Sequence, residues 1–179
     1  MSETVTCASE PSGPAMGAGD ASQQEWDAWQ LYFETTARLT ARIEERLKAN
    51  GCSLMDYQQL LLLYNDPDHR MRIGELAQRL VFSPSRLSYQ IGVLGKRGWV
   101  QRRRVECDGR GWEAVLSEQG ARAFRNLRPA HAHDVRELFL SALQGDDAAR
   151  LTDIMHRVAQ RQEEKEIPAF FDPRAGQSA

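Results

Sequence analysis

Residues 73–116 read IGELAQRLVFSPSRLSYQIGVLGKRGWVQRRRVECDGRGWEAVL, and this stretch decides the fold. Its first apolar residues recur at three- and four-residue steps, which predicts a short helix over Ile73–Leu80. Ser83 and Pro84 then supply an N-cap and a first helical residue, so a second helix should run to about Arg97. The first half of the stretch is therefore a helix, a tight turn and a second helix.

The second half of the stretch has the character of a β-hairpin. Val100–Arg104 and Trp112–Leu116 are short strand-like runs, and the pair Asp108-Gly109 between them is a hairpin turn signal. Two helices followed by a hairpin form a winged helix-turn-helix, in which the second helix enters the DNA major groove. The sequence thus predicts a mainly α fold with a small β-hairpin wing.

The predicted second helix has two distinct faces. At 100° per residue, Leu87, Ile91 and Leu94 fall within about 60° of one another and should face the core. The opposite side is small, polar and basic, as expected of a helix that reads base edges. An ordinary solvated helix has the same composition, so that alternative stays open. The base-reading candidates on this side are Ser85, Arg86, Ser88 and Tyr89.

Charge is concentrated in the same region. The whole chain has a net charge of −2, yet residues 70–116 carry ten basic and four acidic side chains, a net +6. A basic block in an otherwise acidic chain is typical of a nucleic-acid reading head on a non-binding scaffold. Lys96, Arg102 and Arg103 are the candidates for phosphate contacts. Arginine outnumbers lysine 20 to 3 throughout, so a biased composition with a solvated basic face is the alternative.

Further helices are predicted on both sides of this region. Residues 1–24 are rich in Ser, Gly, Pro, Ala and Thr and should form a disordered tail. Amphipathic spacing, capping residues and stop signals then define four more helices, and Pro129 predicts a kink in the third. These helices cover about residues 25–51, 53–64, 117–143 and 148–166.

Several classes of protein are not expected. No apolar run approaches the roughly 20 residues that span a bilayer, and no secretory signal is recognisable, so a cytoplasmic protein without membrane contact is predicted. Cys7, Cys52 and Cys107 match neither a disulfide framework nor a zinc site. His131 and His133 stand two apart on a helix, which makes a poor metal pair, and are expected at the surface. Phosphate-binding and nucleophile motifs are lacking, so neither an enzyme nor a cofactor is predicted.

About residues 26–165 resemble the MarR family of bacterial winged helix-turn-helix transcriptional regulators. The resemblance rests on LMDYQQLLLLY (54–64), on RIGELAQRLVFSPSRLSYQIGVLGKRGWVQRR (72–103) and on the wing segment ECDGRGWEAVLSEQG (106–120). Its most specific element is the Asp-x-Arg of the wing, here Asp108 and Arg110. The resemblance implies that Arg110 enters a minor groove, whose negative potential attracts arginine, with Asp108 orienting its guanidinium. The alternative is an ion pair that merely stabilises the turn.

The resemblance also implies a domain organisation and a mode of action. Residues 25–167 would form the MarR-like domain, with 25–52 and 118–167 as dimerisation helices and 53–117 as the DNA-binding region; 168–179 would be a loose tail. A homodimer would place its two recognition helices in successive major grooves of double-stranded DNA, roughly 34 Å apart, on an inverted-repeat operator. The expected function is a transcriptional repressor that a small ligand releases.

The ligand and two other functions remain open at this point. Regulators that resemble this chain bind small aromatic or anionic compounds between the dimer helices and the reading head, and the first helix offers Trp26, Trp29, Tyr32 and Arg38. The same residues would equally serve packing. One alternative function is a thiol-based redox sensor through Cys52, which precedes a helix start that favours a lower pKa. The other is a winged-helix protein-interaction module without DNA binding.

Overall fold

The computed structural model describes residues 21–105 and 111–162. The chain divides within the first helix, α1 (Gln23–Ala49), into two compact units, Met1–Ala37 and Arg38–Ala179. In the first unit, the amide and hydroxyl of Ser22 both donate to the Glu25 carboxylate at the start of α1. The large side chains of this part of α1 are exposed: Trp26, Trp29, Leu31, Tyr32 and Phe33.

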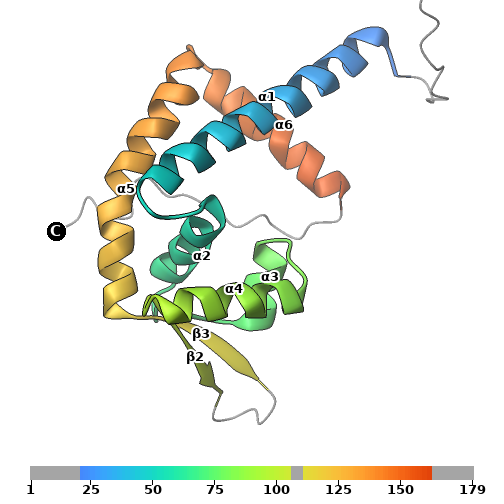
Figure 1. The fold of residues 1–179 in the computed structure, drawn as a ribbon. Coiled ribbons are helices and arrows are strands. Elements are labelled where there is room, and N and C mark those ends of the chain that lie inside the picture. The colour runs from blue at the N-terminus through green and yellow to red at the C-terminus, as the bar shows by residue number, and fades with distance from the viewer. Residues whose placement is uncertain (1–20, 106–110, 163–179) are drawn as a thin grey trace, which may run out of the picture. The chain divides into compact units, whose positions relative to one another are not determined.

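The second unit contains the helix-turn-helix and the wing, as predicted. The helices and strands after α1 are α2 (Leu54–Asn65), β1 (Arg70–Arg72), α3 (Ile73–Arg79), α4 (Pro84–Lys96), β2 (Val100–Arg104), β3 (Trp112–Leu116), α5 (Glu118–Leu138), the 3-10 turn η1 (Leu140–Ala142) and α6 (Asp147–Arg161). Figure 1 shows β2 and β3 extending from the region of α3 and α4. The mainly α class with a small wing is confirmed.

The predicted capping signals are present. Ser53 and Asp56 form a capping box at the start of α2. The Ser83 hydroxyl accepts from the Arg86 amide, with Pro84 as the first residue of α4. The Ser117 hydroxyl accepts from the Gly120 amide and donates to the Gly98 carbonyl at 2.6 Å, which joins the turn between α4 and β2 to the start of α5.

Two predictions about these elements were wrong. The wing sheet has three strands in the order β1-β3-β2 rather than two, because Arg70–Arg72 pairs antiparallel with β3. Three residues are too few to show a strand period, so only the pairing partner reveals β1. The helix expected to reach about Leu143 ends at Leu138, because Phe139 leaves the helical region with φ −135° and ψ −58°. The end predicted for the last helix, Glu166, lies outside the described residues, and the kink at Pro129 stays a prediction.

The core of the second unit lies between α2, the reading head and α5. Leu60 and Leu63 of α2 are fully buried, and Phe124 of α5 stacks near Tyr57 with ring centroids 5.3 Å apart. The contact between α5 and the wing is close, because a Cβ on Gly120 would lie 2.1 Å from the Trp99 carbonyl oxygen. α5 therefore continues directly from the base of the wing.

An ion-pair cluster fastens the end of α1 to α5 within the second unit. The Arg46 guanidinium lies 2.8 Å from Asp134 and 2.7 Å from Glu137. Hydrogen bonding to Arg46 lowers the pKa of the Glu137 carboxyl group and raises that of the guanidinium. Among residues 21–105 and 111–162, no helix has the length and apolar character needed to cross a membrane.

Candidate DNA interface

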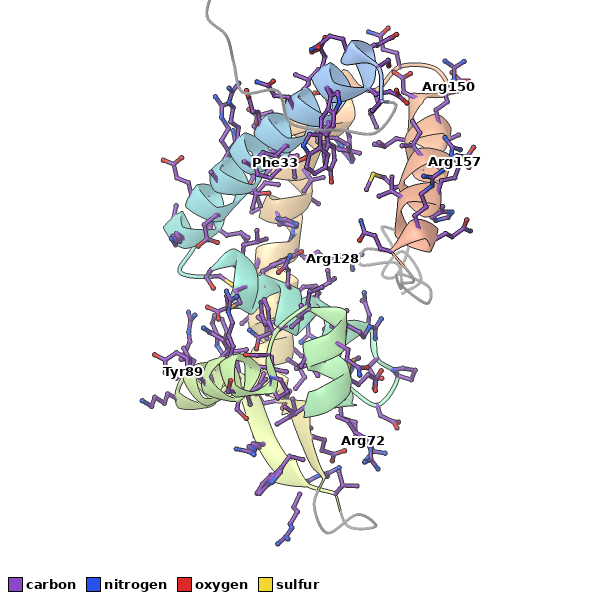
Figure 2. The ribbon with its side chains drawn as sticks, turned by 90° about the vertical axis from the view of Figure 1, so that its right-hand side faces the viewer. Phe33, Arg72, Tyr89, Arg128, Arg150 and Arg157 are labelled. Carbon is purple, nitrogen blue, oxygen red and sulfur yellow. The ribbon has the colours of Figure 1, made fainter. Side chains whose placement is uncertain are left out.

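The recognition helix α4 has the two faces that its sequence predicts. Leu87, Ile91 and Leu94 are at most 2% exposed and pack into the core. On the other side Tyr89 is 71% exposed and extends from the outer face of α4 (Figure 2). Ser85 and Arg86 are exposed as well, and Ser88 is half-buried. The four predicted base-reading residues therefore border one accessible surface.

Phe82 also lies beside the exposed face of α4, although it is not among the residues predicted there from the sequence. Its side chain packs against the core, and the Arg86 guanidinium carbon lies 4.4 Å from the centroid of its ring. An arginine over an aromatic face is attracted to the ring quadrupole and held in place. The sequence contains a signal for this contact, because the two residues stand four positions apart across the helix start.

Arg97 belongs to the basic block but serves the fold. Its guanidinium stacks 3.6 Å from the Trp99 ring centroid, donates to the Gly51 carbonyl and lies 3.4 Å from the Asp56 carboxylate. These contacts tie the end of α4 to the start of α2. Lys96, one residue earlier, is exposed and fits the phosphate contact predicted for it.

The two predicted phosphate-contacting arginines of the wing have different partners. Arg103 is the register partner of Glu113, which is only 9% exposed, and its Nε donates to the Glu113 carboxylate at 2.7 Å. Arg102 is the register partner of Ala114 instead, and its guanidinium carbon lies 4.2 Å from the Trp112 ring centroid. In the sequence, Arg102 and Arg103 look equivalent, and no signal there predicts a role for Glu113 or Trp112 at the interface. Asp108 and Arg110 lie outside the described residues, so their roles stay predictions.

The four predicted ligand-pocket residues are exposed. Trp26, Trp29 and Tyr32 belong to the first unit, with exposed fractions of 38%, 55% and 46%. Trp29 contacts Tyr32 and Phe33 through tilted rings. Arg38 is the first residue of the second unit and is also exposed. Their ligand role stays a prediction.

A cavity of about 330 Å³ lies elsewhere, between α1, α2 and α5 of the second unit. Its lining is mostly apolar, and Thr40, Tyr57, Gln58 and His131 add polar groups. The ring centroids of Tyr57 and His131 are 4.2 Å apart. Among the described residues, neither the Tyr57 hydroxyl nor Nδ1 of His131 has a hydrogen-bond partner. Its lining residues are Leu39, Thr40, Ile43, Leu54, Tyr57, Gln58, Leu61, His131 and Val135.

His131 corrects the expectation that both histidines lie at the surface. His133 is exposed, whereas His131 is half-buried against Tyr57. Burial lowers the pKa of His131, because a charged imidazolium is less well solvated there than in water; the Asp134 carboxylate opposes this shift. The ring is therefore held in its neutral form over a wider pH range.

Cys52 corrects the expectation of a lowered thiol pKa. Its side chain is 1% exposed, and its thiol donates to the Ser53 carbonyl at 3.4 Å. Burial, followed by the nearby Asp56 carboxylate, raises the pKa of Cys52 to about 12. Burial raises the thiol pKa by more than the nearby helix N-terminus lowers it. The thiol that is best placed for a redox sensor is therefore both inaccessible to solvent and held in its neutral, unreactive form.

Comparisons with known proteins agree with this geometry. A model of the MarR family matches residues 50–111. AbsC, a MarR family transcriptional regulator from Streptomyces coelicolor, is 32% identical in an alignment that covers 81% of this chain and 98% of AbsC, with a TM-score of 0.77. The chain belongs to the MarR family. It is a winged helix-turn-helix transcriptional regulator.

Two further relatives of this MarR family regulator carry functional information of their own. Sco3205, a MarR family transcriptional regulator from S. coelicolor, was solved in complex with DNA; it is 30% identical over 79% of this chain and 93% of Sco3205, with a TM-score of 0.74. The transcriptional repressor MprA of Escherichia coli K12 is 26% identical over 147 residues, which is 82% of this chain and 83% of MprA.

Proposed function

We propose that this regulator is a repressor that binds duplex DNA as a homodimer and that a small ligand releases it. The observation that carries the proposal is α4: its apolar face is buried while its polar, basic face is accessible beside the wing. Sco3205, which resembles this chain in sequence and fold, is known in complex with DNA. The similarity to the repressor MprA supports the direction of regulation.

The proposed division of labour assigns each part of the reading head a task. Base edges in the major groove are read by Ser85, Arg86, Ser88 and Tyr89, because their side chains border the exposed face of α4. Of the three residues predicted to contact phosphates, we assign this task to Lys96 and Arg102, which position the protein without reading sequence. The third, Arg103, is paired with Glu113. Asp108 and Arg110 would place the wing in a minor groove. A regulator with this task works where the DNA is, so a cytoplasmic location is proposed with it.

A second copy of the chain is the proposed partner of the outer helices. On α6, Ile154 and Val158 are 47% and 42% exposed although they stand on one apolar side of an amphipathic helix. The first unit separately exposes its aromatic residues. We propose that residues 25–52 and 118–167 bury these side chains in a dimer, that 53–117 bind DNA, and that 1–24 and 168–179 are tails. Such burial is the usual use of an apolar helix face.

The proposed ligand is a small aromatic or anionic compound. The 330 Å³ cavity supports this part of the proposal, because a mostly apolar lining with a few polar groups is the usual composition of a ligand pocket. The exposed residues Trp26, Trp29, Tyr32 and Arg38 are the alternative location.

Selection of bound duplexes from a random library tests the proposed DNA recognition. We expect enrichment of an inverted repeat whose half-sites are separated by about one helical turn, since two-fold protein symmetry is mirrored in the operator. Affinity for the selected duplex should fall steeply with salt, because phosphate contacts release counterions. Absence of any salt-dependent duplex binding would favour the protein-interaction module instead.

A further inference from the structure

The two faces of the wing treat their arginines differently. Successive residues of a strand point to opposite faces, so Arg102 and Arg103 cannot act on the same side of the sheet. On one face, Arg103 forms its 2.7 Å ion pair with the buried Glu113. A carboxylate with little solvent access requires its cationic partner, so this pair holds β2 and β3 together. The charge of Arg103 is compensated within the fold.

On the other face, Arg102 is held by an aromatic ring instead of a carboxylate. Trp112 is the register partner of Arg104, so it is a diagonal neighbour of Arg102 and within reach of a long side chain. The guanidinium carbon of Arg102 lies 4.2 Å from the centroid of the Trp112 ring. A stacked guanidinium keeps its full charge. Its N–H groups point outward from its edge, where they can donate hydrogen bonds to an oxyanion.

The stacked pair borders a hollow that suits a phosphate-bearing strand. The hollow has a volume of about 470 Å³ and lies between the wing and the first turn of α3. Among the described residues that line the hollow, Arg72 and Arg102 are basic and Glu75 is acidic, so these lining residues carry a net positive charge. A Cβ on Gly74 would meet no atom within 4 Å, which shows open space at the α3 side.

We propose that Trp112 is a positioning residue that holds the Arg102 guanidinium toward a DNA phosphate, whereas Arg103 stabilises the wing and makes no such contact. This inference rests on the proposed DNA-binding function. An arginine loses rotamer freedom when it binds a phosphate, and the ring removes part of that freedom beforehand. Trp112 thereby strengthens binding through Arg102 without itself contacting DNA.

The test compares four variants of the full chain on the duplex selected for the wild type: Trp112→Ala, Trp112→Phe, Arg102→Ala and the double change Trp112→Ala/Arg102→Ala. Affinity is measured over a range of salt concentrations, and thermal unfolding checks the fold of each variant. We expect Trp112→Ala to weaken DNA binding about two- to fivefold. Trp112→Phe should keep most of the wild-type affinity, because it retains an aromatic ring. Arg102→Ala should weaken binding further and lower the slope of log affinity against log salt by about one. In the Arg102→Ala background, Trp112→Ala should cause no additional loss.

Arg103→Ala is the matched control, since it removes the same charge from the next residue. It should lower the melting temperature but leave the salt slope unchanged; if it fails to fold, Arg103→Ala/Glu113→Ala removes both partners of the ion pair instead.

An equal drop in salt slope for Arg102 and Arg103 variants would contradict the division between the faces. Additive losses for Trp112 and Arg102 would show that the ring contacts DNA itself, and wild-type affinity in a folded Trp112→Ala would remove the role altogether. If the wild type binds no duplex, the proposed function fails, and the positioning role fails with it.

Discussion

At the scale of the residue, burial decides which ionisable side chains are available for chemistry. Cys52 and His131 illustrate this, because burial disfavours the charged form of each. Desolvation raises the pKa of Cys52 and lowers the pKa of His131. Arg102 and Arg103 show the same dependence on surroundings, since a ring holds one and a buried carboxylate holds the other. Residue type alone therefore does not assign a role.

His131 should make the protein sensitive to mild acid. Its folded pKa lies below its ordinary value near 6.5, so the unfolded chain takes up a proton first as pH falls. Above about pH 6.5, neutral His131 makes its full contribution to the free energy of unfolding. This contribution is lost as pH falls from about 6.5 toward the folded pKa, and it changes no further below the folded pKa. Urea unfolding between pH 7.5 and 5 should show a smaller loss of stability for His131→Gln than for the wild type.

The exposed neighbour provides the control for this measurement. His133→Gln is the matched control, because His133 is exposed and lacks the burial from which the effect of His131→Gln is expected to arise. Identical pH profiles for His131→Gln and the wild type would show that His131 is not a source of acid sensitivity.

At the scale of the element, close backbone contacts set how the wing and helices join. Gly120 lies in the first turn of α5, where Ser117 caps the helix and also bonds the Gly98 carbonyl. This arrangement brings the backbone of Trp99 against α5 so closely that a side chain does not fit. The orientation of the wing relative to α5 thus depends on a residue without a side chain.

Gly120→Ala should destabilise the protein by about 1–3 kcal/mol, because the added methyl group forces a backbone shift in a packed region. Its Cβ would lie 2.1 Å from the Trp99 carbonyl oxygen and 2.9 Å from Leu116. Gly92→Ala in α4 is the matched control: its Cβ would meet nothing within 4 Å, so helix propensity should raise stability by up to about 1 kcal/mol. Chemical denaturation of both variants measures the difference, and equal stabilities would contradict the contact.

At the scale of the whole molecule, the candidate ligand cavity lies next to the helix that supports the reading head. α2 contributes Leu54, Tyr57 and Leu61 to the cavity, and its Asp56 pairs with Arg97 at the end of α4. A ligand that shifts α2 would therefore act on α4 through a direct contact. A change in DNA affinity requires that the ligand bind the two arrangements with different affinity.

Benzoate and phenol are suitable probes of this coupling. If either occupies the cavity as an inducer, it should weaken duplex binding about 5–150-fold at saturation, and the duplex should weaken the probe by the same factor. Fluorescence titrations with and without duplex measure both directions. Val135→Phe should abolish probe binding by filling the cavity while leaving DNA affinity intact. A probe whose affinity is indifferent to DNA binds elsewhere or is not an inducer.

Sequence reasoning was most successful where structure depends on near neighbours. Residues a few positions apart determine the helix caps, two strands of the wing and the buried face of α4. The caps are Ser53, Ser83 and Ser117, and the strands are β2 and β3. Turn and capping preferences act over such distances, so the winged fold was predictable from residues 73–116. The base-reading candidates were predictable as a surface for the same reason, because helical periodicity alone separates them from the core.

The tertiary structure decided what depends on distant partners. β1 exists because Met71 pairs with Ala114, and Arg97 is structural because it contacts Asp56, 41 positions earlier. His131 is half-buried because Tyr57 of another helix covers it. The sequence by itself determined the order of the elements and the accessible face of α4, since local preferences follow from the backbone. Burial, ion pairing and ring stacking required the folded chain, because they arise only when segments far apart in sequence meet.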